Sequence, residues 1–123
     1  MGVLPSQSIS KLILKKIIFA DSEIEKSQIQ PASLDLRLGN VAWRVRASFL
    51  TGKDKDVTDL LDEFKMHQID MIEGAVLEKG CVYLIPIEEN LNLPADLSAI
   101  ANAKSSTGRL DLLTRVITDK GTE

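Results

Sequence analysis

Apolar residues recur at helical spacing at the start of the chain. Ile9, Leu12, Ile13 and Ile17 follow one another at intervals of one, three or four residues, which places them on one face of a helix near residues 6–18. Lysines occupy the opposite face, as expected of a solvated surface, and serines stand where a helix N-cap is favoured. The pattern predicts one amphipathic N-terminal helix.

From about residue 28 the apolar residues alternate with polar ones, which is typical of a strand with one buried face. The leucines of residues 34–38 alternate in this way, and the alternation resumes in residues 41–45 after the turn signal Gly39-Asn40. The pattern predicts a hairpin whose leucines face the core. Asp35, opposite an arginine, is then interpreted as a structural cross-strand pair.

The least regular stretch is residues 51–70. An aspartate-rich loop opens it, and the apolar residues between Val57 and Phe64 then allow one short helix. The aspartates do not match a calcium-binding loop, because the glycine and the terminal glutamate of such a loop are not at the required positions. His67 stands alone and is expected at the surface. We interpret the stretch as a solvated loop and helix.

After Gly74 the chain again has the pattern of β structure. Two short apolar runs surround the turn signal Lys79-Gly80, a third run lies between Pro94 and Asn102, and residues 110–119 predict a last strand. Because no helix of crossover length lies between these strands, the sheet is expected to be mainly antiparallel. The predicted fold is mainly β, a jelly roll or barrel with an N-terminal helix.

Composition limits the function classes. The chain has 123 residues, 44% of them hydrophobic and 27% charged, with a net charge of −3, which fits one soluble globular domain without a basic bias toward nucleic acid. No apolar run approaches the length of a membrane helix, and no signal peptide is recognisable. The single cysteine, Cys81, excludes an internal disulfide and favours a cytoplasmic location.

Counting side chains excludes one enzyme class, and the motif context makes a second unpromising. A zinc-dependent deaminase or hydrolase needs three protein ligands, usually histidines and cysteines at fixed spacings, and this chain has one histidine and one cysteine. No zinc site is therefore expected. A Ser-His-Asp triad is equally unpromising, because no serine stands in a nucleophile-elbow context.

Residues 104–109, KSSTGR, are the densest cluster of chemically useful groups. Lys104 and Arg109 supply positive charge, the hydroxyls between them are hydrogen-bond donors, and Gly108 permits close approach of the backbone. Such a cluster suits a polyphosphate, but an exposed polar loop with two cations explains it equally well on chemistry alone. It is not a Walker loop, since the glycines and lysine stand in a different order.

KSSTGR resembles the [KR]-S-S-x-[AG]-R motif of the dCTP deaminase and dUTPase superfamily. The approach to it, LEKGCVYLIPIEENLNLPADLSAIANAKSSTGRL, is similar to the superfamily's passage of strand, acidic turn, Leu-Pro and a further strand. QPASLDLRLG resembles the family's early strand, and the opening LPSQSI resembles the deaminase branch. The similarity thus runs over nearly the whole chain, and the central loop is its weakest part.

The resemblance implies a single dUTPase-like domain over residues 1–123, with a distorted jelly-roll fold, that forms a homotrimer with active sites shared between subunits. It implies hydrolytic removal of the 4-amino group of dCTP, giving dUTP and ammonia without zinc, in pyrimidine deoxynucleotide metabolism. Magnesium would be bound through the triphosphate. No nucleic acid or membrane partner is implied. Whether dUTP is hydrolysed further is left open.

The resemblance also assigns roles to single residues. Lys104, Ser105 and Ser106 would bind phosphates, and Ser105 would also help to position the attacking water. Arg109 would act near the base and that water. Thr118 falls where the family uses a backbone carbonyl to hold the water. Attack on C4 of the base does need an oriented water, a proton acceptor and stabilisation of a tetrahedral centre.

The sequence departs from the family pattern in two places. Asp111 stands where relatives often have glycine. The family's general acid/base glutamate lies on a strand after the last predicted one, and Glu123 is not in a matching context. Residues 1–123 are therefore interpreted as the N-terminal part of a longer deaminase. Two alternatives stay open: a non-catalytic nucleotide-binding or regulatory domain of the same fold, and an assembly module whose polar loop binds no ligand.

Overall fold

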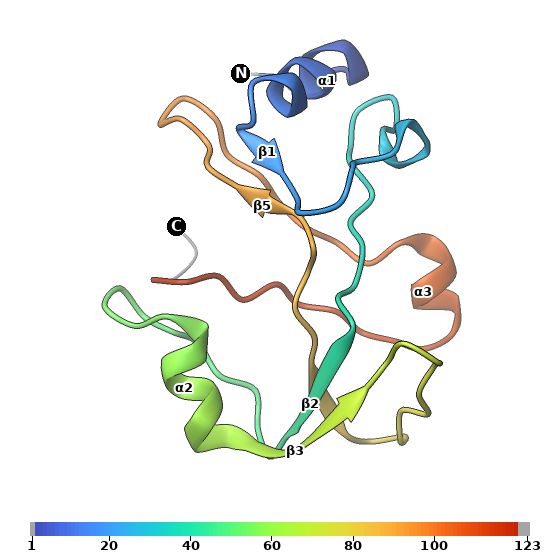
Figure 1. The fold of residues 1–123 in the computed structure, drawn as a ribbon, viewed down its shortest axis with the longest axis vertical. Helices are drawn as coiled ribbons and strands as arrows, with labels where there is room; N and C mark the ends of the chain where they lie inside the picture. The colour runs from blue at the N-terminus through green and yellow to red at the C-terminus, as the bar shows by residue number, and fades with distance from the viewer. Residues whose placement is uncertain (1, 121–123) are drawn as a thin grey trace. The chain divides into compact units, whose positions relative to one another are not determined.

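The structure is a computed structural model, and it describes residues 2–120 (Figure 1). Glu123 lies outside the described residues. The chain divides into two compact units. The first contains Met1–Ala42, Asp70–Ala75 and Ile85–Ser98, and the second contains Trp43–Ile69, Val76–Leu84 and Ala99–Glu123. That residues 1–123 form a single domain stays a prediction.

The first unit begins with helix α1, Ser6–Leu14, at the predicted place. Its Ile9 is buried. The helix ends earlier than expected, because Lys16 adopts a left-handed backbone with φ of 55°. The amides of Lys16 and Ile17 then donate to the carbonyls of Ile13 and Leu12, both at 2.9 Å, which completes a Schellman motif.

The remaining elements of the first unit are short. Strand β1, Ile18–Phe19, pairs antiparallel with β5, Asn90–Leu91, and a 3₁₀ turn η1 spans Lys26–Gln28. This pairing brings the start of the chain beside a segment about seventy residues later. Ile18, like Ile9, belongs to the small apolar core of this unit.

The hairpin predicted at Gly39-Asn40 is wrong. Leu38 forms an isolated antiparallel bridge with Ile87, and the amide of Gly39 donates to the carbonyl of Pro86 at 2.7 Å. A Cβ at this position would lie 3.2 Å from the ring and the carbonyl oxygen of Pro86, a tight contact that glycine avoids.

The predicted facing of the leucines is also wrong. Leu36 and Leu38 are 40% and 57% exposed, whereas Arg37 between them turns toward the buried carboxylate of Glu89. The alternation is real, but the arginine occupies the inner position because its charge has a buried partner there.

The second unit contains a three-stranded sheet in the order β3-β2-β4. Its strands are Val41–Val45 (β2, of which residues 43–45 belong to this unit), Lys65–Asp70 (β3) and Val82–Leu84 (β4). Strands β2 and β4 pair antiparallel, with Trp43 opposite Leu84. The strand β3 was not expected, because exposed polar residues fill most of it and leave no alternating pattern.

Helix α2, Val57–Phe64, follows the sequence prediction. The amide of Asp56 donates to Oδ2 of Asp59 at 2.9 Å, which satisfies a backbone group at the helix start. Phe64 at its end stacks on the buried Phe49 with ring centroids 4.9 Å apart, and the guanidinium of Arg46 lies 5.6 Å from the Phe64 ring. His67 is exposed, as predicted.

Gly80 makes the predicted turn, with φ of 77°, but the apolar run before it is not a strand. The runs predicted between Pro94 and Asn102 and over residues 110–119 are likewise not strands in the described part of the chain. Ile100 and Leu113 are 89% and 95% exposed. An apolar alternating segment becomes a strand only where a partner accepts its backbone hydrogen bonds, and residues 2–120 supply none for these two segments.

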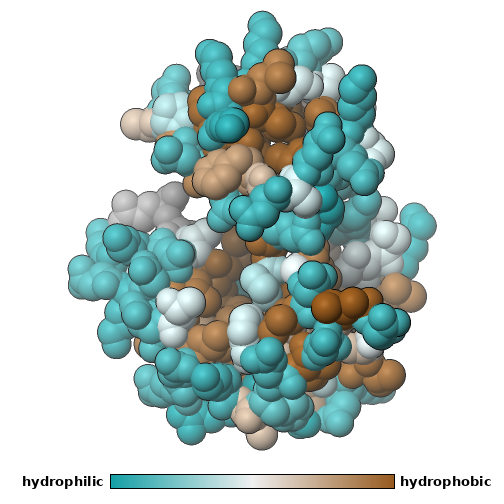
Figure 2. Space-filling view, viewed as in Figure 1, coloured by the Kyte–Doolittle hydropathy of each residue, from teal (hydrophilic) through white to brown (hydrophobic). Residues whose placement is uncertain are grey.

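The mainly β, antiparallel class is therefore confirmed, whereas the described residues form two open sheets and no closed one. Figure 2 shows apolar side chains open to the surface among the hydrophilic ones. Within residues 2–120, no helix is long and apolar enough to cross a membrane.

Candidate functional site

The KSSTGR segment forms a helical turn, α3, Ser105–Arg109. Lys104 precedes it in an extended conformation, with ψ of 151°. Because residues four apart lie on the same side of a helix, Ser105 and Arg109 share one side, and Ser106 is next to it. Lys104, both serines and Arg109 are exposed. The structure therefore gathers the predicted phosphate-binding and base-binding groups on one short solvent-facing turn.

The end of α3 is fixed by its backbone. The amides of Asp111 and Leu112 donate to the carbonyls of Gly108 and Thr107 at 3.0 and 3.3 Å, again as a Schellman motif. Asp111 has φ of 61°, in the left-handed region that favours glycine. The departure from the family pattern at this position thus falls on a residue whose backbone conformation suits the family's glycine.

Gly108 is not required by packing in the described chain. A Cβ built on it meets no atom within 4 Å. The predicted close approach to its backbone is therefore not made by residues 2–120, and it stays a prediction.

Thr118 lies in a different environment from α3. Its carbonyl oxygen accepts a hydrogen bond from the Thr51 hydroxyl, with an Oγ1–O distance of 2.7 Å. Thr51 is 5% exposed. Figure 1 shows α3 and the C-terminal end of the described chain at opposite ends of an extended segment within the second unit. Within one chain, four of the predicted site residues therefore lie together and Thr118 lies apart from them. The four are Lys104, Ser105, Ser106 and Arg109.

Arg115 holds the same segment to the same loop. Its Nη2 atom donates to the Ser48 hydroxyl at 2.6 Å and to the carbonyl of Phe49 at 3.2 Å. Neither Thr51 nor Arg115 belongs to a sequence motif considered above, and no periodicity singles them out. Their role is visible only from these contacts, which join residues 66 or 67 positions apart in the chain.

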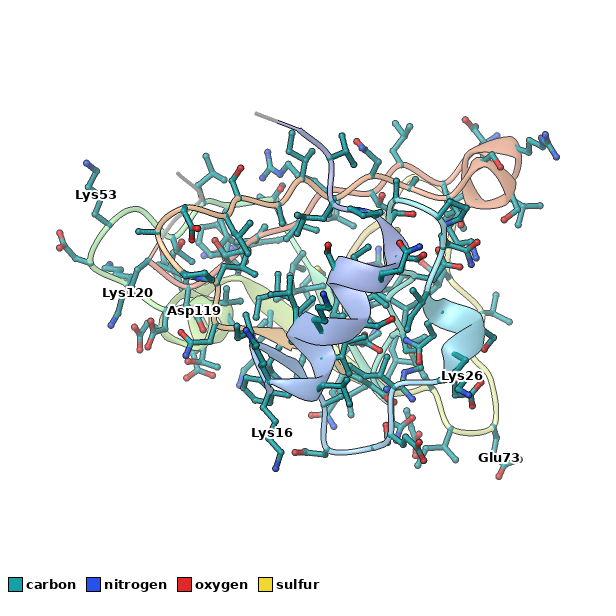
Figure 3. The ribbon with its side chains drawn as sticks, turned by 90° about the horizontal axis from the view of Figure 1, so that it is seen from above. Lys16, Lys26, Lys53, Glu73, Asp119 and Lys120 are labelled. Atoms are coloured by element: carbon teal, nitrogen blue, oxygen red, sulfur yellow. The ribbon has the colours of Figure 1, made fainter. Side chains whose placement is uncertain are left out.

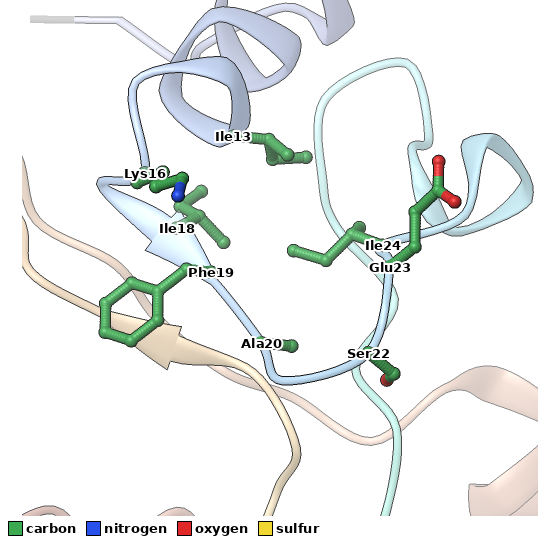
Figure 4. A pocket seen from close by; sticks show the side chains of 8 residues that line it. All are labelled: Ile13, Lys16, Ile18, Phe19, Ala20, Ser22, Glu23 and Ile24. Carbon is green, nitrogen blue, oxygen red and sulfur yellow. The ribbon is translucent and has the colours of Figure 1, made fainter.

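A hollow of about 420 Å³ lies elsewhere, in the first unit. Figure 4 shows Ile13, Ile18 and Ile24 pointing toward its interior from the α1–β1 region and the loop that follows. It contains no predicted site residue, and its lining is largely apolar. The oxygens of a triphosphate need charged and hydrogen-bonding partners, so a hollow with this lining is not a candidate triphosphate site.

Residues 2–120 contain no group of three or more His, Cys, Asp or Glu side chains placed to hold a metal ion. Cys81 is partly exposed, with its sulfur 3.6 Å from Oε2 of Glu78. The cationic and hydroxyl groups of α3 are suited to an anion rather than to a metal ion.

Comparison with known proteins identifies the family of the chain. A family model described as the 2′-deoxycytidine 5′-triphosphate deaminase N-terminal domain matches residues 1–123. A relative from Methanobrevibacter smithii, named "dCTP deaminase, dUMP-forming", is 27% identical over 119 residues, which cover 94% of this chain and 60% of that protein. A protein of the same name from Dictyoglomus thermophilum is 33% identical over 119 residues, covering 90% and 58%.

A crystal structure of 2′-deoxycytidine 5′-triphosphate deaminase from Agrobacterium tumefaciens has the same fold, with 52% sequence identity and a TM-score of 0.94. The match covers 99% of this chain and 35% of that one. The chain also spans only about 60% of the length of the curated relatives above. It belongs to the dCTP deaminase family, and within that family it corresponds to the N-terminal domain.

Proposed function

We propose that the protein containing residues 1–123 hydrolyses the exocyclic C4–N bond of dCTP, a cyclic amidine, and releases ammonia. The relatives carry this activity in their names. The observation that carries the proposal is the grouping of Lys104, Ser105, Ser106 and Arg109 on α3, in a chain that matches the deaminase N-terminal domain over its whole length.

The chemistry divides between binding and proton transfer. The ammonium of Lys104 and the hydroxyls of Ser105 and Ser106 bind triphosphate oxygens through charge-assisted hydrogen bonds. Water attacks C4, and the new C–O bond gives a tetrahedral centre. One water proton moves to N3 of the base and the other to the amino nitrogen, the C4–N bond breaks, and dCTP and water become dUTP and ammonia. Arg109, one turn from Ser105, stabilises negative charge near the base, and Ser105 orients the water.

Magnesium enters this proposal through the substrate. Bound to the triphosphate, it would neutralise phosphate charge. The KSSTGR segment offers cations and hydroxyls, which complement phosphate oxygens. A magnesium ion held directly by the protein would instead need carboxylates. Lys104 and the two serines would therefore bind a nucleotide that carries its own metal ion.

The active unit is proposed to be a homotrimer of jelly-roll subunits with sites shared between subunits. Two observations support this. Thr118 and α3 are held apart within one chain, so that a second subunit could bring its own Thr118 to α3. Ile100, Leu110 and Leu113 are exposed in segments whose sequence alternates as in strands. Further chain or a neighbouring subunit would supply the missing strand partners.

Ammonia release from dCTP tests the proposal, measured with magnesium on the protein extended by the C-terminal part that the relatives possess. We expect turnover that needs both magnesium and the triphosphate. Tight dCTP binding without ammonia release would favour the non-catalytic alternative, and no binding would favour the assembly module. Product analysis then assigns the second step: dUMP with pyrophosphate would show that the protein resembles the dUMP-forming relatives in product as well.

A further inference from the structure

We propose that Thr51 is a positioning residue for the deamination, because its buried hydroxyl fixes the direction of the Thr118 carbonyl. This inference rests on the proposed function and on the role that the resemblance assigns to Thr118, whose carbonyl would hold the attacking water. Thr51 does not touch the water itself. It acts through the backbone of Thr118, to which its Oγ1 donates at 2.7 Å.

The loop that carries Thr51 is anchored in the core of the second unit. Phe49, two residues earlier, is buried and stacks on Phe64 of α2. Thr51 is itself 5% exposed, and a buried hydroxyl costs free energy unless it is hydrogen-bonded. Its bond to Thr118 has the most common length of an O–H···O hydrogen bond. The donor is thus held in place before any substrate binds.

Residues 48–57 contact the chain on both sides of Thr118. Before it, Arg115 donates to Ser48 and to the carbonyl of Phe49. After it, Oδ1 of Asp119 accepts from the amide of Val57 at 2.7 Å.

The amide of Lys120 adds a further contact, since it donates to the carbonyl of Lys55 at 2.8 Å. Figure 3 shows Asp119 and Lys120 beside the loop that carries Lys53. Residues 112–118 have no strand pairing in the described structure, so these contacts with residues 48–57 determine the path of the segment.

A carbonyl oxygen can accept two hydrogen bonds, one at each lone pair. The hydrogen bond from Thr51 therefore fixes the direction of the Thr118 carbonyl, and with it the place of a water bound to that oxygen. A small misplacement of a reacting atom can lower the rate about a hundredfold. Because Thr118 holds the water and not the triphosphate, loss of the Thr51 hydroxyl should lower kcat and leave KM nearly unchanged.

The test compares Thr51→Val, which removes the hydroxyl at nearly constant shape, with Thr51→Ser, which keeps it. Thr58→Val makes the same chemical change at an exposed position of α2 and serves as the control. In the C-terminally extended protein we expect Thr51→Val to lower kcat by about 10-fold or more, with KM within about threefold. Thr51→Ser should restore most of the rate, and Thr58→Val should match the parent.

A second readout does not depend on activity. Hydrogen exchange at the amide of Lys120 should be faster in Thr51→Val than in the parent or in Thr58→Val, because the segment loses its central contact. If Thr51→Val does not fold, Arg115→Ala carries the test, with Arg44→Ala as its control. Arg44 pairs with Glu78 elsewhere in the second unit.

The outcomes separate the two proposals. A parent protein that releases no ammonia contradicts the proposed function. An active parent whose Thr51→Val variant keeps its kcat contradicts the positioning role alone. A loss of kcat that Thr51→Ser does not restore would also contradict it, because the hydroxyl would not be the cause. If Arg115→Ala replaces the first variant, an unchanged kcat contradicts the claim that anchoring this segment to residues 48–57 positions the Thr118 carbonyl.

Discussion

Arg37 binds the carboxylate of Glu89 with both its backbone and its side chain. The amide of Arg37 lies 2.8 Å from Oε2 of Glu89, and Nε lies 2.7 Å from Oε1. The amide nitrogen Nε2 of Gln28 also donates to Oε1, at 2.8 Å, and the Glu89 side chain is fully buried. Two nearby positions, Gln28 and Arg37, therefore meet a carboxylate that lies more than fifty residues later in the chain.

Replacement of Glu89 by Gln should destabilise the protein by about 1.5–3 kcal/mol, since it removes the buried charge that accepts hydrogen bonds from Arg37 and Gln28. Glu88→Gln is the matched control. The Glu88 carboxylate lies 3.4 Å from the same Nε but is about one-third exposed, so its loss should cost less than about 1 kcal/mol. Urea unfolding of both variants measures the difference, and equal losses would contradict the central role of Glu89.

The Glu89 interaction should also depend on pH. Burial alone raises the pKa of Glu89, but the hydrogen bonds from Arg37 and Gln28 outweigh it and hold the pKa below its ordinary value of 4.5. A lowered folded-state pKa stabilises the protein above the unfolded-state pKa, and this contribution is lost as pH falls through the folded value. The stability difference between parent and Glu89→Gln should therefore shrink below about pH 4.5. A difference that stays constant down to pH 3 would contradict this assignment.

The pairing of Arg37 with Glu89 shows what the local pattern could and could not predict. Alternation correctly located extended backbone around residues 34–45, and helical spacing located α1 and α2. It could not tell which side of residues 34–38 is buried, because that depends on a carboxylate fifty-two residues away. Nor could it tell that Gly39 packs against Pro86 instead of making a hairpin turn.

The conformation of Asp111 gives a stability prediction at the site. Its φ of 61° costs a residue other than glycine about 1 kcal/mol, so Asp111→Gly should stabilise the protein by up to about that amount. Lys16→Gly, at the equivalent position after α1, should do the same. Lys15→Gly is the control, because Lys15 has φ of −80° and gains nothing from glycine. Thermal melts of the three variants check the prediction, and a rise with Lys15→Gly would contradict it.

The motif residues themselves should matter for binding more than for folding. We expect Lys104→Ala and Arg109→Ala to weaken binding of dCTP with magnesium by about 10-fold or more, since each exposed cation contributes little to stability but binds the ligand directly. Lys79→Ala, at an exposed turn of the same unit, is the control. Calorimetric titration beside thermal melts measures both quantities. Equal affinity in parent and variants would contradict the proposed site.

The sequence predicts which candidate site residues lie together where they are adjacent, but not where they are distant along the chain. The KSSTGR motif is contiguous, so its side chains had to lie together whatever the fold. They lie on a helical turn, and within the described chain the segments on either side of it are not strands. The contact of Thr51 with Thr118 joins residues sixty-seven positions apart and has no sequence signature.

Residues 1–123, produced alone, should release ammonia from dCTP far more slowly than the C-terminally extended protein. The resemblance assigns the general acid/base glutamate to a strand after residue 123, and general acid–base catalysis typically contributes about 10²–10⁴-fold. Asp111 is the carboxylate nearest in sequence to α3. Its left-handed backbone ends the helix, and its side chain is exposed, so no described contact aims it at Ser105 or Arg109.

Addition of the following strand and the C-terminal closing segment should restore turnover, because it supplies the proton-transfer group and confines the water. The two proteins are compared for ammonia release at equal subunit concentration, with dCTP and magnesium in excess. A version of the extended protein in which that glutamate is replaced by glutamine is the control, and it should be as slow as the short chain. Equal rates in the short and extended proteins would place the proton-transfer group within residues 1–123. They would contradict its assignment to the strand after residue 123.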